Sequence, residues 1–166
     1  MRLASSLFFV LALSLGLGLG LSHQVNAAVT QAPGLELDTR NGAVSLKDFR
    51  GRVVYLDFWA SWCKPCVKSF PWMQTMNATY QSQGLEIVAV NLDKNRDLAE
   101  AFLKKIKVDF TIAFDQKGET AKTYELRGMP TSYLIGRDGK IYATHIGFRE
   151  KDKPKLEQAF QQLLNQ

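Results

Sequence analysis

The pattern of apolar and polar positions along the chain predicts buried strands that alternate with amphipathic helices. Nearly continuous apolar runs are typical of strands covered on both faces, and such runs lie at residues 53–58, 85–92, 110–114 and 131–135. A further strand is expected at 140–146, because the turn Arg137-Asp138-Gly139-Lys140 would fold it back on the preceding strand as an antiparallel hairpin.

Between these runs, apolar residues repeat at helical spacing. Helices are expected at about 65–82, 97–106 and 119–126, and from Pro154 to the end of the chain. Pro71 should kink the first of them. The residues predicted to face the core are Leu98, Phe102 and Ile106 in the second helix, and Leu156, Phe160, Leu163 and Leu164 in the last.

A small hairpin is predicted before the first buried strand. Apolar and polar residues alternate over 35–39, Asn41-Gly42 suits a two-residue turn, and residues 43–44 form the returning strand. Residues 45–48 (SLKD) then predict one capped helical turn. The order is therefore a β-hairpin, then βαβαβα, then ββα. Such an order predicts an α/β fold with a mixed sheet and helices on both faces.

Residues 1–27 do not belong to this pattern. Arg2 precedes an apolar run from Leu3 to Leu21, and Val25-Asn26-Ala27 places small residues where a signal peptidase acts. We therefore expect a secretory signal over 1–27 and one domain over 28–166, without a stable membrane span once the signal is cleaved. The expected location is the periplasm, or outside the cell. An uncleaved membrane anchor is the alternative.

The charge of the chain argues against nucleic acid as a partner. The formal net charge is +5, but the basic residues are scattered, and no basic helix with interleaved aromatic residues occurs in the sequence. The charge instead predicts a solvated surface with a mild preference for acidic partners.

The candidate chemistry lies in residues 61–71 (SWCKPCVKSFP), which contain both cysteines, Cys63 and Cys66. A disulfide across two residues closes almost no loop, so it would be a poor structural restraint. The pair follows a strand and begins a helix, where free N–H groups and the helix dipole lower a thiol pKa. We expect an exposed Cys63 as nucleophile and a more buried Cys66 as resolving thiol. Lys64 and Lys68 add positive charge nearby.

Two segments resemble the thioredoxin superfamily. DFWASWCKPC is similar to its active-site segment, and GMPTSYLIGRDGKIYATHIG to its cis-proline loop and following hairpin. The signal segment, the N-terminal hairpin and FPWM after the second cysteine are similar to the exported TlpA/ResA/DsbE-like thiol-disulfide oxidoreductases. The resemblance runs from about Leu35 to the C-terminus. It implies a thioredoxin fold: a central mixed β-sheet with helices on both faces and an N-terminal β-hairpin extension.

The resemblance also implies a function and partners. The protein is expected to exchange disulfides with protein clients as a reductant, in cytochrome c maturation or periplasmic thiol homeostasis. It is expected to be a monomer without a cofactor, and to receive electrons from a membrane thiol transporter. An oxidising foldase is the alternative within the same chemistry, and the reduction potential decides between them.

Site roles follow from the resemblance as well. Pro130 matches the cis-proline, and Met129 before it would offer its backbone to an extended client, in the manner of strand addition. Further client contacts are expected at Trp62, Lys64, Pro65 and Thr131.

Asp57 matches an acid that accepts a proton from the buried cysteine, here Cys66. Burial should raise its pKa. Many thioredoxins place a lysine near this acid on the next strand, where Ala89 is expected here. Several relatives have a glutamate three residues after the second cysteine, where this chain has Ser69. That difference weakens the match to the cytochrome c maturation branch.

A metal- or haem-delivery module is the alternative from another class. His145 is the only histidine after the signal, and it could join Cys63 and Cys66 around copper. Copper chaperones of this type space their cysteines by three residues, so we expect no metal site and an ordinary strand histidine. A peroxidase is not favoured, because no PxxxT-type stretch precedes Cys63. Trp59 could serve packing or function, and Trp72 is expected to be half-exposed.

Overall fold

Eight strands form one mixed sheet in the order β1-β8-β7-β4-β5-β6-β2-β3. The structure is a computed structural model, and it describes residues 29–166. The signal and cleavage site expected at 1–27 lie outside the described residues. The strands are β1 (Thr30–Gln31), β2 (Glu36–Thr39), β3 (Gly42–Ser45), β4 (Val53–Trp59), β5 (Leu85–Asn91), β6 (Thr111–Phe114), β7 (Thr131–Ile135) and β8 (Lys140–Ile146).

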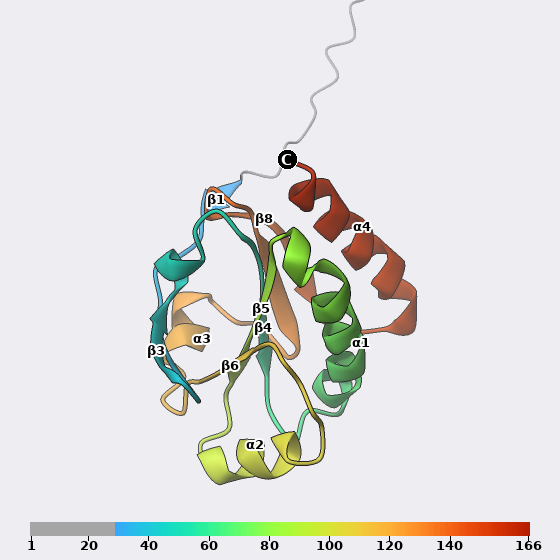
Figure 1. The fold of residues 1–166 in the computed structure, drawn as a ribbon. Helices are drawn as coiled ribbons and strands as arrows, with labels where there is room; N and C mark the ends of the chain where they lie inside the picture. Colours follow the sequence, from blue (N-terminus) through green and yellow to red (C-terminus); the bar gives the residue numbers. More distant parts are fainter. Residues whose placement is uncertain (1–28) are drawn as a thin grey trace, which may run out of the picture.

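Helices cover both faces of this sheet (Figure 1). The helices are α1 (Lys64–Tyr80), α2 (Arg96–Leu103), α3 (Glu119–Thr123) and α4 (Lys153–Leu164), with short 3-10 turns η1 (Leu46–Phe49), η2 (Gln81–Gln83) and η3 (Glu150–Asp152). Figure 1 shows α1 and α4 on one side of the sheet, and α3 with the hairpin β2–β3 on the other. The predicted α/β architecture is confirmed. Within residues 29–166, no helix has the length and apolar composition needed to cross a membrane.

Strand β4 lies at the centre of the sheet and positions the residues that precede the cysteines. It pairs in parallel with β5 along its whole length and antiparallel with β7. All its residues are buried. Val53, Tyr55 and Trp59 pack in the core under α1 and α4, whereas Val54, Leu56 and Phe58 pack in the core of the opposite face. Because side chains alternate along a strand, Asp57 faces the α1 side.

The predicted N-terminal hairpin is present, but its turn is one residue earlier than expected. Thr39 pairs with Gly42, so the turn residues are Arg40 and Asn41. Gly42 has a φ of 108°, which a glycine tolerates better than other residues. The hairpin joins the sheet through antiparallel pairing of β2 with β6, and β1 adds a short pair with β8. The capped turn that follows is confirmed, because Ser45 and Asp48 form a reciprocal capping box.

The predicted buried face of the second helix is correct for Phe102 and Ile106, which pack against the core, and wrong for Leu98. Leu98 is 52% exposed, whereas Ala99 and Leu103 are buried. The Asn95 side chain accepts a hydrogen bond from the Asp97 backbone and caps the helix start. In the last helix, the four predicted core residues are all buried.

Trp72 is also more buried than predicted. Only 7% of it is exposed, because its ring packs against Tyr55, Phe148 and Phe160. Its neighbour Pro71 lies within α1, which continues as one helix past it.

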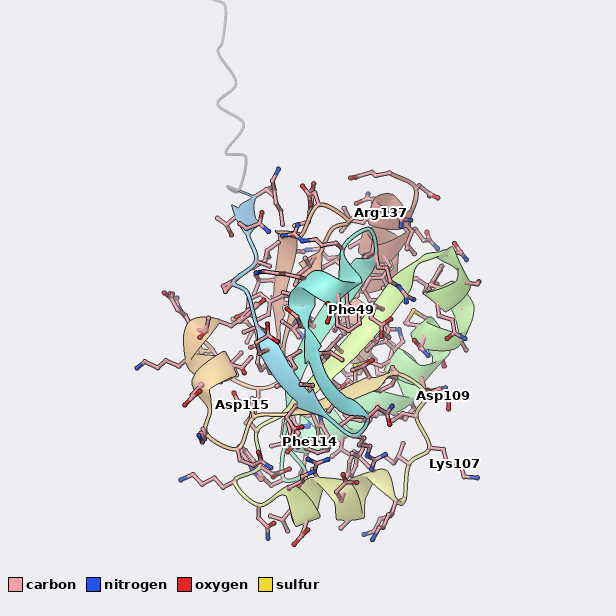
Figure 2. All side chains as sticks on the ribbon, turned by 60° about the vertical axis from the view of Figure 1, so that its left-hand side comes forward. Phe49, Lys107, Asp109, Phe114, Asp115 and Arg137 are labelled. Carbon is pink, nitrogen blue, oxygen red and sulfur yellow. A yellow bond between two sulfur atoms is a disulfide. The ribbon has the colours of Figure 1, made fainter. Side chains whose placement is uncertain are left out.

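Arg137 joins three chain segments at the end of the sheet away from Phe114 and Asp115 (Figure 2). Its guanidinium donates to the carbonyl oxygens of Gly51 at 2.7 Å, Gln83 at 3.2 Å and Leu164 at 3.1 Å. The Leu164 carbonyl lies in the final turn of α4, where a carbonyl has no hydrogen-bond partner within its own helix. Arg137 therefore holds α4 and η2 to the loop that precedes β4.

Candidate active site

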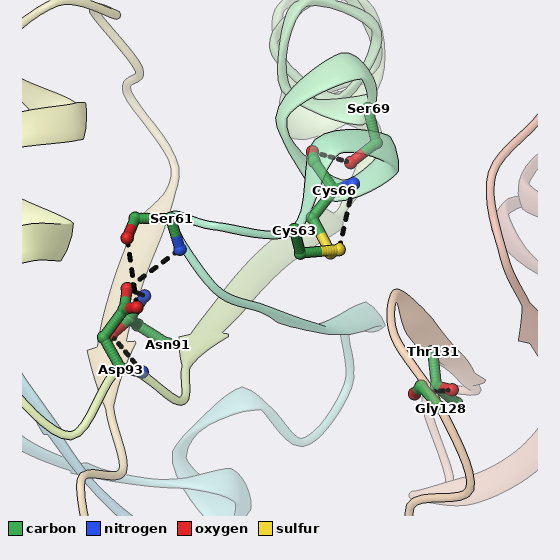
Figure 3. Close-up of a disulfide and its surroundings, with 8 residues drawn as sticks. All are labelled: Ser61, Cys63, Cys66, Ser69, Asn91, Asp93, Gly128 and Thr131. Atoms are coloured by element: carbon green, nitrogen blue, oxygen red, sulfur yellow. Dashed lines mark hydrogen bonds between the residues drawn. A yellow bond between two sulfur atoms is a disulfide. The ribbon is translucent and has the colours of Figure 1, made fainter.

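Both cysteines lie where β4 leads into α1, and a disulfide joins them (Figure 3). Cys63 is the N-cap residue of the helix, and its Sγ accepts a hydrogen bond of 3.3 Å from the Cys66 backbone N–H. Pro65 occupies the first turn, where the lack of an N–H costs no helical hydrogen bond. The Sγ of Cys63 therefore lies at the electropositive end of a 17-residue helix.

The expected exposure of Cys63 is wrong for this oxidised form. Cys63 is 5% exposed and Cys66 is fully buried. Cys63 is therefore the more accessible of the two, as predicted, but both side chains are covered. The bond to a buried partner draws the Cys63 sulfur against the helix. The exposed residue at this point is Trp62, with 67% of its surface accessible. Trp59 is fully buried against Phe70 and Phe102, as a packing residue is.

A buried carboxylate fixes the loop that leads to Cys63. Asp93 accepts hydrogen bonds from the Ser61 backbone N–H at 2.9 Å and the Ser61 hydroxyl at 3.0 Å. It also accepts one from the side-chain amide of Asn91 at 2.8 Å (Figure 3). Asp93 was not among the site residues predicted from the sequence. The signal was a polar Asn-x-Asp directly after a buried strand, at the edge of the sheet where the parallel strands β4 and β5 both end.

Ser69 lies in α1, three residues after Cys66. It is buried, and its hydroxyl donates to the Cys66 carbonyl at 2.7 Å (Figure 3). This bond turns the side chain back onto its own helix, as serine does when it lies inside a helix.

Asp57 is buried on the α1 face of the sheet, with 2% of its surface exposed. It pairs with Ala89 on β5, as predicted, and with Ser132 on β7. Within the described part of the chain, its Oδ2 has no hydrogen-bond partner. Burial raises the pKa of this carboxyl well above its ordinary value. Burial also raises the pKa of Tyr55, and the Asp57 charge raises it further.

The loop before β7 lies across from the cysteines. The Met129-Pro130 peptide bond is cis, and the backbone N–H of Gly147 donates to the Pro130 carbonyl at 2.7 Å. Thr131 is 1% exposed, and its hydroxyl donates to the Gly128 carbonyl at 2.7 Å (Figure 3). Thr131 therefore lies behind the loop, where it holds Gly128.

An open groove of about 640 Å³ lies between this loop and the start of α1. Four of the five residues predicted to contact a client line this groove, and so does Cys63 itself. Its lining residues are Trp62, Cys63, Lys64, Pro65, Leu92, Leu126, Arg127, Gly128 and Met129. Thr131 is not among them. Three lining residues were not predicted from the sequence, because they belong to no motif and approach the cysteines only in the folded chain: Leu92, Leu126 and Arg127.

His145 lies on β8 and pairs with Ser132. Its Nε2 is 3.5 Å from Oδ2 of Asp152, at the start of α4. Between residues 29 and 166, no three His, Cys, Asp or Glu side chains are grouped closely enough to hold a metal ion.

The sequence model of the AhpC/TSA family matches residues 28–144. The chain belongs to this family. Among its relatives are the thiol-disulfide oxidoreductases ResA of Bacillus thuringiensis subsp. konkukian and Bacillus subtilis. The first is 39% identical over 121 residues, which is 73% of this chain and 69% of ResA. The second is 36% identical over 119 residues, which is 71% of this chain and 66% of ResA.

Solved structures of thiol-disulfide proteins also superpose on this chain. A Chlorobium tepidum protein described as a thiol:disulfide interchange protein DsbE superposes with a TM-score of 0.81 at 50% identity, covering 82% of this chain and 96% of its own. StoA of Bacillus subtilis superposes with a TM-score of 0.65 at 33% identity, covering 76% and 95%. The expected thioredoxin fold is confirmed. This AhpC/TSA family member is a thiol-disulfide oxidoreductase, an enzyme whose family acts on the thiols of protein clients.

Proposed function

We propose that this oxidoreductase reduces disulfides of protein clients outside the cytoplasm, with Cys63 as nucleophile and Cys66 as resolving thiol. The observation that carries the proposal is the asymmetry of the pair. Cys63 lines the open groove, whereas Cys66 lies one turn into α1 and is fully buried. A client disulfide can therefore reach only Cys63.

The reaction proceeds in two exchanges. The Cys63 thiolate attacks one sulfur of the client disulfide, which forms a mixed disulfide and releases the other client sulfur as a thiolate. The Cys66 thiolate then attacks the Cys63 sulfur and displaces the first client sulfur. The client gains two electrons and two protons and leaves as a dithiol. The enzyme is left with the Cys63–Cys66 disulfide that the structure contains.

Asp57 is proposed as the acceptor of the Cys66 proton. Cys66 must lose its proton to act, and its burial keeps bulk water away. Asp57 lies on the same face of the sheet as the start of α1, and its raised pKa allows it to hold a proton nearer to neutral pH.

Client binding is proposed at the groove, through Trp62, Lys64, Pro65 and Met129. The backbone of Met129 would pair with an extended client segment by strand addition. Pro130 and Thr131 would hold the loop that carries Met129 in place. The Pro130 carbonyl accepts a hydrogen bond from the Gly147 N–H, and the Thr131 hydroxyl donates one to the Gly128 carbonyl.

We also propose that the protein is exported and works outside the cytoplasm. The sequence of residues 1–27 supports export with cleavage after Ala27, which would leave a monomeric domain of residues 28–166 in the periplasm or outside the cell. A membrane thiol transporter would then supply electrons, by reducing the Cys63–Cys66 disulfide after each turnover. An oxidising foldase would use the same site in the opposite direction.

A redox titration of the Cys63–Cys66 couple against dithiothreitol tests the direction. Thioredoxin-type reductants lie near about −270 mV and strong oxidants near about −120 mV, so a value close to the first supports a reductant and a value close to the second contradicts it.

Trapping tests the two roles of the cysteines. Cys66→Ser should accumulate mixed disulfides with client proteins, because nothing displaces the client from Cys63. Cys63→Ser should form none and should lose insulin-disulfide reduction. If Cys63→Ser traps clients and Cys66→Ser does not, the roles are reversed.

A further inference from the structure

The groove beside Cys63 contains two cations and no acidic residue among its nine lining residues. Lys64 comes from the start of α1, and Arg127 from the loop before the cis-proline. Both side chains are exposed. Neither takes part in a salt bridge within residues 29–166.

This lack of a carboxylate partner distinguishes Arg127 from four other arginines of the surface. Arg40, Arg52, Arg96 and Arg149 each contact a carboxylate. The acidic residue nearest to Arg127 in sequence is Glu125, which lines a neighbouring hollow together with it but forms no salt bridge with it in the described structure.

The two cations lie within reach of a client attached to Cys63. Lys64 is adjacent to Cys63 in the chain, and Arg127 lines the groove from the opposite wall. An extended client segment advances about 3.3 Å per residue. Side chains one or two positions from the attacked cysteine therefore lie within about 7 Å of it, between the two walls.

We propose that this groove selects clients with an aspartate or glutamate within two residues of the attacked cysteine, a specificity that rests on the proposed disulfide-reducing function. Arg127 is the main determinant, because its planar guanidinium binds a carboxylate through two parallel hydrogen bonds. Lys64 adds a second positive charge. The apolar residues Trp62, Leu92 and Met129 receive the neighbouring client side chains, and a basic client residue at the same place is repelled.

Three peptides test this specificity. They share one disulfide and one sequence and differ only at the position next to the attacked cysteine, which is Asp, Asn or Lys. The second-order rate constant for oxidation of the reduced protein by each peptide is measured by stopped-flow fluorescence at low salt. Exposed ion pairs contribute modestly, so we expect the Asp peptide to react about threefold to tenfold faster than the Lys peptide. The preference should shrink in 0.5 M salt.

Charge variants test whether Arg127 causes the preference for the Asp peptide. Arg127→Glu should reverse it, and Arg127→Lys should keep most of it. The matched control is Lys155→Glu, which makes the same change of charge sign at an exposed position of α4 outside the groove, and it should retain the wild-type preference.

Equal rates of the wild type with the three peptides would overturn the specificity, and so would an Arg127→Glu variant that behaves like Lys155→Glu. Either result leaves the reductase function standing, because the Asn peptide still reports it. If reduced wild type fails to react with any of the three peptides, the proposed function itself is wrong.

Discussion

Removal of the Asp57 carboxyl should change how the stability of the oxidised protein depends on pH. The carboxyl is almost fully buried, and its Oδ2 has no partner among the described residues. Burial is the cause of its raised pKa. Because the cysteines are joined and do not titrate in the oxidised form, Asp57→Asn isolates the contribution of this one group at the site.

Proton linkage determines whether the free energy of unfolding rises or falls with pH. Below the unfolded-state pKa of about 3.9, the carboxyl is protonated in both states. Between the unfolded and the folded pKa, only the unfolded chain releases the proton, so the free energy of unfolding falls by up to about 1.4 kcal/mol per pH unit. Above the folded pKa the contribution is constant. Since burial raises the pKa of Asp57 well above its ordinary value, the free energy of unfolding should fall throughout the pH range between the unfolded and the folded pKa.

The assay is urea unfolding of the oxidised wild type and Asp57→Asn at half-unit steps from pH 4 to pH 8.5. The quantity to plot is the difference between their free energies of unfolding, because most other titrating groups cancel in it. The Asn amide is left without a partner, which costs about 1–3 kcal/mol at every pH. The absolute difference is therefore less informative than its change with pH.

Asp57→Ser serves as the matched control, because it removes the same carboxyl but leaves a different polar group. Both variants should give the same pH dependence relative to the wild type, with different constant offsets. A difference that stays level from pH 4 to pH 8.5 in both variants would refute the argument, because the folded and unfolded pKa of Asp57 would then be equal.

Three further substitutions test the framework around the site, each by urea unfolding. Arg137→Ala should lower the free energy of unfolding by about 2 kcal/mol, because three backbone carbonyls lose a charged donor; Arg137→Lys should recover only part of the loss. Phe160→Ala should cost about 3–5 kcal/mol, because this fully buried ring packs on two other aromatic rings. Asp93→Ala should cost about 1–3 kcal/mol and accelerate hydrogen exchange at the Ser61 amide, which loses its acceptor.

Much of the fold could be predicted from the sequence, because buried strands and turns leave strong local signals. The strands at 131–135 and 140–146 begin and end where the sequence places them. The central strand is predicted to within one residue. Both cysteines are correctly placed at a helix start, and Asp57 is correctly predicted to be buried with a raised pKa.

The remaining features depend on contacts between distant segments. The exposure of Leu98 could not be predicted from three apolar residues at a spacing of four, because Ala99 and Leu103 fill the buried face of α2 beside Phe102 and Ile106. Arg127 belongs to the groove only because the loop before β7 folds against the start of α1. The coverage of Cys63 and Trp72 likewise follows from partners that the sequence does not place beside them.

The anchoring of β4 on both sides has a consequence for how the two redox forms differ. The strand before the cysteines is hydrogen-bonded to β5 and β7, and Asp93 holds the loop that continues from it. We therefore expect the backbone of this region to stay in place when the disulfide opens. We expect a client or an electron donor to distinguish the two forms by the chemistry of the Cys63 sulfur in the groove, rather than by a change of shape.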